Sequence, residues 1–269
     1  MRKAPQEKLK QLHQLLLNLK SCAIAYSGGV DSTFLIKVAY DALGDNALAV
    51  TATSSTYPVR ELEDAKQYAQ ELGIPHIVIQ SEELDIPKFS DNPPDRCYYC
   101  KKELFQKIQQ IAKEHRLKTV IDGSNADDTF DYRPGARARS ELQIRSPLKE
   151  VGLTKQEIRQ LSASLRLKSS EKPAFACLAS RFPYGVKITK ERLKQVEAAE
   201  EYLFSLGIRQ YRVRYHDHIA RIEVSPDDFP NILAHAQKVI KRFKTLGFTY
   251  ITLDLEGYRT GSLNEVLDK

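Results

Sequence analysis

The feature that most constrains the fold is an alternation of short apolar runs with helix-patterned segments over the first 122 residues. The apolar runs are CAIAY (22–26), ALAVTAT (47–53), HIVIQ (76–80) and KTVIDG (118–123). Between them, helix patterns cover about 31–42, 59–72 and 101–115. Strands that alternate with helices predict βαβ units, and therefore a mostly parallel sheet with helices on both faces. Ligands of such α/β sheets bind at the carboxyl ends of the strands.

A different pattern begins after about residue 185. A helix pattern over about 189–206 precedes two segments of alternating apolar residues, QYRVRYH (210–216) and IARIEVS (219–225). A helix over about 229–246 and a last strand, TYITLDL (249–255), complete the chain. We therefore predict two domains, residues 1–185 with a parallel sheet and residues 186–269 with a smaller α+β fold.

Composition excludes several classes of protein. The chain has 269 residues, 42% of them hydrophobic, so it can bury a sizeable core without disulfides. Charged residues make up 28%, and the absence of a long apolar run excludes a membrane-spanning helix. The N-terminal segment MRKAPQEKLKQLHQLLLNLK has the pattern of an amphipathic helix and not of a signal peptide, which favours a cytoplasmic protein. The net charge of +6 suits an anionic ligand, but basic and acidic residues are interleaved, so we expect no nucleic-acid partner.

The loop SGGVDST (27–33) joins the first predicted strand to a helix. It lacks the lysine of a Walker A motif and the GxGxxG of a dinucleotide site. Gly28 and Gly29 let backbone N–H groups approach an anion, Ser27 and Ser32 add hydroxyl donors, and the helix N-terminus favours negative charge. Asp31 would repel bare phosphate, so we interpret it as a ligand of a Mg²⁺ ion that bridges phosphates. The alternative is a tight strand–helix turn in which Asp or Ser caps the helix.

The string SGG-x-DS after an apolar strand resembles the PP-loop of the N-type ATP pyrophosphatases. The resemblance implies a Rossmann-like fold of the adenine nucleotide alpha hydrolase kind, which binds ATP and Mg²⁺, activates a substrate by adenylation and releases pyrophosphate. Donors and a metal ion at the leaving pyrophosphate would stabilise the charge that develops there. In this superfamily the end of the second strand lies near adenosine, which makes Thr53 and Ser54 candidates; ordinary turn chemistry is the alternative.

Four cysteines occur, Cys22, Cys97, Cys100 and Cys177. Cys97 and Cys100 form a CxxC at the start of a predicted helix, where thiolates are favoured. Such a pair could bind a metal, act as a redox pair, or do neither. Together with Cys177 it would give three thiolates without a clear fourth ligand, which suits a [4Fe–4S] cluster with one open iron better than a closed zinc site. Cys22 begins a strand and reads as a core residue.

Further strings resemble one family over almost the whole chain, the LarE-type ATP-dependent sulfur transferases. They are DGSNADDTFDYRPGARARS (122–140), SRFPYG (180–185), YRVRYHDHIARIEV (211–224) and YITLDLEGYRTGSLNEVL (250–267). The resemblance implies an enzyme of nickel-pincer nucleotide cofactor biosynthesis. It would adenylate the carboxylates of pyridinium-3,5-biscarboxylic acid mononucleotide and insert sulfur to give thiocarboxylates. Members with three cysteines take the sulfur from a [4Fe–4S] cluster, whereas others sacrifice one cysteine; the pattern here favours the cluster, with Cys177 as a ligand.

The resemblance also implies roles for single residues. Cys177, Asp31, Ser180 and Arg181 are the catalytic candidates, with Arg181 neutralising an acyl phosphate or the phosphate of AMP. Strand alternation puts Arg212 and Arg214 on one face, where they would bind a substrate phosphate; a solvent-facing charged strand is the alternative. The remaining candidates are a divalent-ion site at Glu200, Glu223 and Asp254, and a substrate mouth shaped by Asp128 and Arg133. We also expect a homo-oligomer; the sulfide donor and the recipient of the cofactor are left open.

Two other functions remain at this stage. The first is an amide-forming ligase of the NAD synthetase kind, which would leave the three cysteines without a role. The second is a tRNA thiolase, which the basic pI of about 9.0 permits although no separate RNA-binding module is evident.

Overall fold

The computed structural model describes residues 4–129 and 134–267. The contacts within the chain divide it into two compact units. Unit 1 contains Met1–Glu82 and Asp95–Phe175, and unit 2 contains Glu83–Pro94 and Ala176–Lys269. Whether they are separate domains with a boundary after residue 185 stays a prediction.

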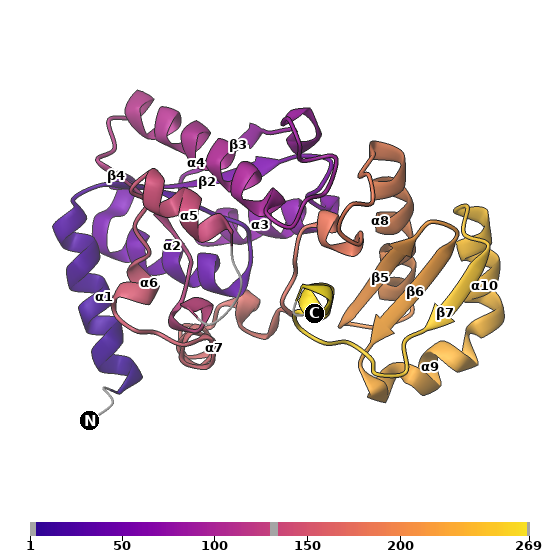
Figure 1. The fold of residues 1–269 in the computed structure, drawn as a ribbon. Helices are drawn as coiled ribbons and strands as arrows, with labels where there is room; N and C mark the ends of the chain where they lie inside the picture. Colours follow the sequence, from indigo (N-terminus) through magenta and orange to yellow (C-terminus); the bar gives the residue numbers. More distant parts are fainter. Residues whose placement is uncertain (1–3, 130–133, 268–269) are drawn as a thin grey trace. The chain divides into compact units, whose positions relative to one another are not determined.

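Unit 1 is an α/β fold (Figure 1). Its strands are β1 (Cys22–Ala25), β2 (Ala47–Thr53), β3 (His76–Gln80) and β4 (Thr119–Asp122). Its helices are α1 (Pro5–Leu19), α2 (Val30–Leu43), α3 (Val59–Glu71), α4 (Arg96–Glu114), α5 (Gly135–Glu141), α6 (Pro147–Glu150) and α7 (Lys155–Ser164). All three strand pairings are parallel, in the order β3-β2-β1-β4. The predicted fold class is confirmed.

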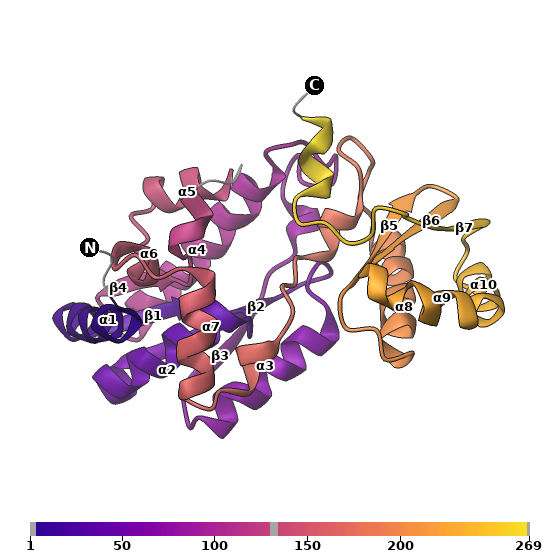
Figure 2. The ribbon, with the colours of Figure 1, turned by 90° about the horizontal axis from the view of Figure 1, so that it is seen from below.

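Strands β1, β2 and β4 of unit 1 are mostly buried, whereas the edge strand β3 is partly exposed. Successive residues of a strand point to opposite faces. Accordingly, Cys22 and Ile24 pack into a core with side chains of α1, α2 and α7, whereas Ala23, between them, packs into a second core with α4. In Figure 2, α4 lies on one side of the strands and α2 on the other. The carboxyl ends of the strands remain at one edge, where their loops meet.

Two helices of unit 1 have clear start signals. Proline occupies the first position of α1, where the missing N–H costs nothing because that group has no partner within a helix. Helix α7 begins with a capping box, in which Thr154 accepts from the N–H of Glu157 and Glu157 accepts from the N–H of Thr154. The ammonium of Lys8 on α1 lies 2.7 Å from the Glu157 carboxylate, so α1 is tied to the start of α7.

Unit 2 contains the predicted α+β elements. They are α8 (Lys190–Ser205), β5 (Tyr211–His216), β6 (Ile219–Val224), α9 (Phe229–Ala234), α10 (Ala236–Thr245) and β7 (Tyr250–Leu253), with 3₁₀ helices at Leu178–Arg181 and Ser262–Val266. Strand β6 is central, antiparallel to β5 and parallel to β7. The single helix predicted over 229–246 is wrong, because it breaks at His235, which ends α9 and precedes α10.

The polar stretch between β3 and α4 contributes to unit 2. The side-chain amide of Asn92 donates to the carbonyls of Phe182 and Pro183, and the carbonyl of Ser90 accepts from the N–H of Ile188. Asn92 is fully buried. A segment that looked like a plain loop therefore supports the chain just after Cys177.

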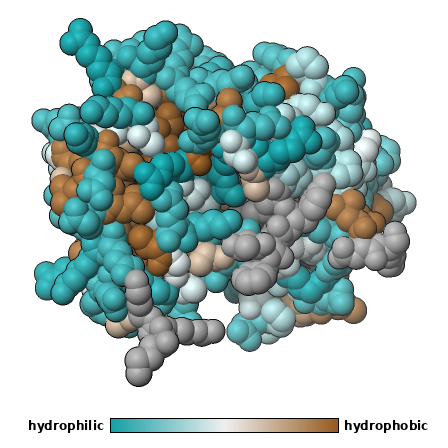
Figure 3. Space-filling view, turned by 60° about the vertical axis from the view of Figure 1, so that its left-hand side comes forward, coloured by the Kyte–Doolittle hydropathy of each residue, from teal (hydrophilic) through white to brown (hydrophobic). Residues whose placement is uncertain are grey.

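The face in Figure 3 is mostly hydrophilic, with smaller apolar areas. Exposed large apolar side chains among the described residues include Val59, Leu233, Leu255 and Val266, and scattered residues of this kind are normal for a folded chain. Over the described ranges, no helix combines the length and the apolar character needed to cross a bilayer.

Candidate active site

The loop 27–33 connects β1 to α2 at the carboxyl edge of the sheet. Gly29 is the N-cap of α2, and no side chain caps the helix, so the turn in which Asp or Ser acts as the cap is not what forms. Instead the Ser32 hydroxyl lies inside the loop, where it accepts from the N–H of Ser27 at 3.2 Å and donates to the carbonyl of Gly29 at 3.2 Å. The first N–H groups of a helix have no partner within the helix, so this loop can present them to an anion.

Close packing fixes the shape of the loop. Gly28 has φ +63°, and a Cβ there would lie 2.9 Å from the Cβ of Ala65 on α3. A Cβ on Gly123, just after β4, would lie 3.1 Å from the backbone nitrogen of Ser32. Tyr57 donates its hydroxyl to the carbonyl of Ser27 at 2.8 Å. The loop is thus held from two sides before any ligand binds.

Asp31 lies in the first turn of α2, and its two carboxylate oxygens have different surroundings. Its Oδ2 accepts from Nζ of Lys155 at 2.7 Å and from Nδ2 of Asn125 at 3.2 Å. Its Oδ1 is buried and, within the described part of the chain, has no hydrogen-bond partner. A buried carboxylate oxygen without a partner is costly unless a cation or donor arrives. The arrangement therefore fits the predicted role of Asp31 as a Mg²⁺ ligand.

Sequence reasoning missed Lys155 and Asn125. Lys155 is the first residue of α7, and the pattern Thr-x-x-Glu at 154–157 could have located this helix start. No local signal brings Lys155 to Asp31, because 124 residues separate them. Asn125 follows β4, so it reaches the loop through the parallel arrangement of β1 and β4.

Thr53 and Ser54 end β2 at the same edge of the sheet. Thr53 is the last residue of the strand, and the Ser54 hydroxyl lies 3.2 Å from that of Thr56. Asp128 accepts from the N–H of Asn125 at 3.1 Å, so it shapes the segment after β4. Arg133 lies outside the described residues. The adenosine and substrate roles of these residues stay predictions.

The four cysteines have different surroundings. Cys22 is fully buried in β1, as predicted, and burial raises the pKa of its thiol to about 12. Cys97 and Cys177 are exposed and Cys100 is partly exposed. Cys97 and Cys100 lie in the first turns of α4, which begins five residues earlier than the sequence pattern indicated. They belong to unit 1, whereas Cys177 belongs to unit 2.

Arg212 and Arg214 share one face of β5, but that face is buried, so the solvent-facing alternative is wrong. Arg214 is bound to both oxygens of Glu223 on β6 at 2.9 Å and also to the carbonyl of Ser180. Arg212 contacts the hydroxyl of Tyr258 at 2.9 Å, and no carboxylate within the described ranges pairs with it. Burial and the charges of neighbouring arginines lower the pKa of Arg212 to about 10. Of these two arginines, Arg212 is therefore the one with charge left for an anionic ligand.

Arg181 is almost completely buried and heavily engaged. Its Nε and Nη2 bind the two oxygens of Glu200 on α8 at 2.8 and 2.9 Å. Its Nη1 donates to the carbonyls of Ala176 and Cys177 and to the hydroxyl of Ser180. The predicted role of Arg181 in neutralising an acyl phosphate or the phosphate of AMP stays a prediction, and these contacts leave the guanidinium little capacity for it.

The three carboxylates predicted to bind a divalent ion each pair with arginine. Glu200 pairs with Arg181, Glu223 with Arg214 and Arg221, and Asp254 with Arg221 and Arg259. Across residues 4–129 and 134–267, no group of three or more His, Cys, Asp or Glu side chains is arranged to hold a metal. The divalent-ion site stays a prediction.

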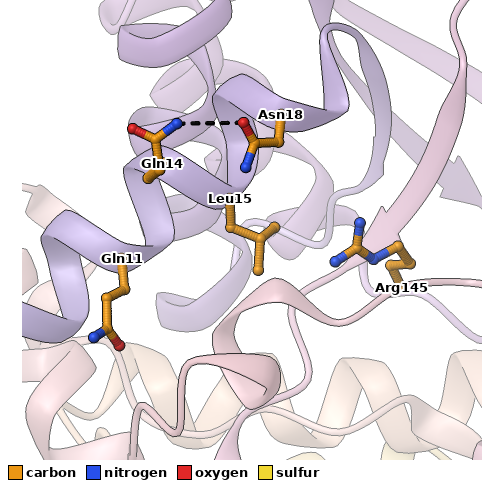
Figure 4. A pocket seen from close by; sticks show the side chains of 5 residues that line it. All are labelled: Gln11, Gln14, Leu15, Asn18 and Arg145. Carbon is orange, nitrogen blue, oxygen red and sulfur yellow. Dashed lines mark hydrogen bonds between the residues drawn. The ribbon is translucent and has the colours of Figure 1, made fainter.

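A surface pocket of about 370 Å³ contains none of the candidate residues. Figure 4 shows its lining, with Gln14 on α1 donating to Asn18 at 3.3 Å. The other lining residues are Gln11, Leu15 and Arg145. These side chains supply no nucleophile or general base, so the chemistry points to the loop 27–33 and to the arginines of unit 2.

Comparison with known proteins identifies the family of the chain. The family model described as NAD synthase matches residues 9–116, which include the loop 27–33. The chain is 47% identical over 266 residues to an uncharacterized protein of Synechocystis, covering 98% of this chain and 99% of that protein. It is 40% identical over 255 residues to the pyridinium-3,5-bisthiocarboxylic acid mononucleotide synthase of Lactiplantibacillus plantarum, covering 94% and 92% of the two chains. An uncharacterized protein of Methanocaldococcus jannaschii is 32% identical over 261 residues, with 94% and 98% covered. The chain is therefore an enzyme that belongs to the family of LarE-type sulfur transferases, built on a PP-loop domain.

Proposed function

We propose that this enzyme uses ATP to adenylate the carboxylates of pyridinium-3,5-biscarboxylic acid mononucleotide and replaces a carboxylate oxygen with sulfur. The product would be the thiocarboxylate precursor of the nickel-pincer nucleotide cofactor. The observation that carries the proposal is the 40% identity, over nearly the whole chain, to a synthase named for the bisthiocarboxylic product. A homo-oligomer, with the C-terminal part contributing substrate binding and assembly, is part of the same proposal.

The loop 27–33 supports the adenylation step. Its backbone N–H groups and the Ser27 hydroxyl would bind the β- and γ-phosphates of ATP at the N-terminus of α2. Asp31 would hold Mg²⁺ through its buried, unpartnered Oδ1; the ion would offset the charge that develops on pyrophosphate. Attack of the substrate carboxylate on the α-phosphate breaks the α–β bond, so pyrophosphate leaves and an acyl adenylate forms.

Arg212 supports binding of a mononucleotide. It is buried and lacks a carboxylate partner in the described part of unit 2. A phosphate group would supply the missing anion through charge-assisted hydrogen bonds. Arg214 stays a second candidate for the phosphate, although Glu223 and the carbonyl of Ser180 already bind its guanidinium.

We further propose that the thiolates of Cys97, Cys100 and Cys177 hold a [4Fe–4S] cluster, which would supply the transferred sulfur as a bound sulfide. All three thiols reach the surface, at least in part, and thiolates are the ligands that such clusters use. The buried Cys22, with its raised pKa, does not suit this role. Sacrifice of the Cys177 sulfur is the competing route.

Mass analysis of the reaction tests the proposal. The protein, purified without oxygen, is incubated with ATP, Mg²⁺, the biscarboxylic mononucleotide and sulfide, and the nucleotide product and the intact protein are weighed. We expect pyrophosphate, AMP and a nucleotide that has exchanged oxygen for sulfur, with the protein unchanged in mass. Loss of hydrogen sulfide from Cys177 would establish the sacrificial route, and iron-free protein that still transfers sulfur would contradict the cluster.

Two parallel incubations test the other functions. Replacing the substrate with deamido-NAD and ammonia tests for an amide-forming ligase. The match to the NAD synthase family model is the reason to test this function. Salt-sensitive binding of tRNA tests for a tRNA thiolase. Amide product, or tight tRNA binding, without any thiocarboxylate would overturn the proposed function.

A further inference from the structure

We propose that the buried ion pair between Arg181 and Glu200 positions the turn that carries Cys177, and that sulfur transfer depends on this pair beyond its effect on stability. This inference rests on the proposed function, since it assigns Cys177 to the sulfur-transfer step. It makes Arg181 and Glu200 positioning residues rather than groups that touch the substrate.

The backbone of the turn is bound from within unit 2. Nη1 of Arg181 donates to the carbonyl of Ala176 at 2.7 Å and to that of Cys177 at 3.2 Å. The N–H of Ser180 donates to the same Cys177 carbonyl at 3.0 Å, which closes the turn. The carbonyls therefore face a guanidinium that is only 1% exposed, while the Cys177 side chain is exposed. This arrangement fixes the backbone and leaves the thiol accessible.

Glu200 orients the guanidinium. Its two oxygens bind Nε and Nη2 of Arg181, which leaves Nη1 directed to the turn. One of these oxygens also accepts from the N–H of Val213 at 2.9 Å, so the pair links α8 and β5 to the turn. A bidentate pair fixes the plane of the guanidinium, which a lysine could not do.

A second buried arginine holds the other end of the turn. Arg214, bound to both oxygens of Glu223, donates to the carbonyl of Ser180 at 2.6 Å.

Stability alone does not explain a buried ion pair at this place. Moving two charges out of water is costly, and apolar residues of similar size often stabilise a fold as well or better. Burial opposes the charged form of Arg181, but the carboxylate of Glu200 raises its pKa, so the guanidinium stays charged. The guanidinium of Arg181 binds the carbonyls of Ala176 and Cys177, and a need to fix the backbone of this turn explains the pair better.

Two variants separate positioning from stability. Arg181→Lys keeps Glu200 and the positive charge but loses the fork. Arg181→Met/Glu200→Gln removes both charges yet keeps a side-chain oxygen for the N–H of Val213, so no buried charge is left unpaired. The control is Arg145→Met/Glu150→Gln in unit 1, a pair with the same two-point geometry whose guanidinium binds no carbonyl among the described contacts.

The first measurement is the amount of pyrophosphate released per thiocarboxylate formed, which does not depend on the folded fraction. An acyl adenylate that does not react with the sulfur donor is hydrolysed by water. The carboxylate that is regenerated can be adenylated again, so pyrophosphate release continues. We expect this ratio to rise about tenfold or more in both Arg181 variants, since misplacement of a reacting group by about 1 Å can cost a hundredfold, and to stay at the wild-type value in the control. Ratios within twofold of wild type in both variants would overturn the proposal. A rise only in the double variant would also overturn it, because the positive charge of lysine would then suffice without the fork.

The second measurement needs no activity. Hydrogen exchange of the Ser180 and Phe182 amides, which donate to the carbonyls of Cys177 and Ala179, reports on the turn directly. In Arg181→Lys we expect their exchange to accelerate about tenfold or more, while exchange in α8 and β5 stays unchanged. Unchanged protection of the two amides would contradict the proposal. If the wild-type protein released no pyrophosphate, the proposed function would fail, while this measurement would still decide whether the pair holds the turn.

Discussion

Nζ of Lys155 lies 2.7 Å from Oδ2 of Asp31, although 124 residues separate them along the chain. The pair places one positive and one negative charge beside the backbone N–H groups of the loop 27–33. The ammonium occupies one carboxylate oxygen and leaves the buried Oδ1 for a metal ion. Lys155 therefore orients Asp31, and on the proposed function it would also stabilise the negative charge that develops on a leaving pyrophosphate.

Replacing Lys155 tests this relationship. We expect Lys155→Met to lower kcat for pyrophosphate release about tenfold to a hundredfold, because a preorganised cation at the developing charge is lost. The KM for ATP should change less, since the backbone N–H groups still bind the phosphates. The matched control is Lys37→Met, which removes an ammonium paired with Asp41 on the outer part of α2. An unchanged kcat combined with a lower requirement for Mg²⁺ would mean that Lys155 only competes with the metal.

Comparing alanine variants at Gly28 and Gly152 distinguishes the cost of backbone strain from the cost of steric overlap. Both have positive φ, +63° and +73°, so alanine at either position should cost about 1–2 kcal/mol of the free energy of unfolding. At Gly28 the new Cβ would also meet Ala65, which adds about 1–3 kcal/mol through overpacking, whereas nothing lies within 4 Å of a Cβ at Gly152. Urea unfolding and the KM for ATP are measured for both variants. Only Gly28→Ala should raise the KM; equal effects in the two variants would argue against close packing of the loop against α3.

Arg212 and Arg214 should respond differently to methionine. Arg214→Met deprives Glu223 of its bidentate partner, and we expect a loss of about 3 kcal/mol in the free energy of unfolding, at the low end of the range because Arg221 still contacts Glu223. Arg212→Met removes a charge that burial already disfavours, so stability should change by less than about 1 kcal/mol. The KM for the mononucleotide should instead rise about tenfold to a hundredfold. An unchanged KM in Arg212→Met, judged against the exposed Arg209→Met, would remove Arg212 from the phosphate site.

The sequence predicted the sheet of unit 1 well because the strands β1, β2 and β4 are mostly buried and therefore continuously apolar. A run such as ALAVTAT has few alternatives: it is too short for a core helix and is followed by turn residues. The loop 27–33 was predictable for a related reason, since glycines and hydroxyls between a strand and a helix have a chemical purpose of their own. In both cases the decisive information lies within ten residues of chain.

What could not be predicted depends on contacts between distant segments. The Lys155–Asp31 pair, the burial of Arg212 and Arg214, and the packing of Asn92 beneath Phe182 each need the tertiary fold. Alternation placed the two arginines on one face of a strand, but it could not tell whether that face meets water. The break at His235 was missed because a helix pattern continues in phase on both sides of it.

His76 should make the stability of unit 1 dependent on pH. Its Nε2 lies 2.8 Å from the Thr51 hydroxyl, which donates its own proton to the carbonyl of Tyr26, so Nε2 must carry a proton. Burial, together with the charge of Lys66, lowers the pKa of His76 below its usual 6.5. A histidine whose pKa is lower in the folded state contributes stability above the unfolded pKa, and this contribution is lost as the pH falls through the folded value. Urea unfolding above and below pH 6.5 should therefore show a smaller acid loss in His76→Gln, which keeps an N–H for Thr51 but cannot be protonated. The exposed His115→Gln serves as the control, and an acid loss in His76→Gln as large as in the wild type would show that His76 does not govern this range.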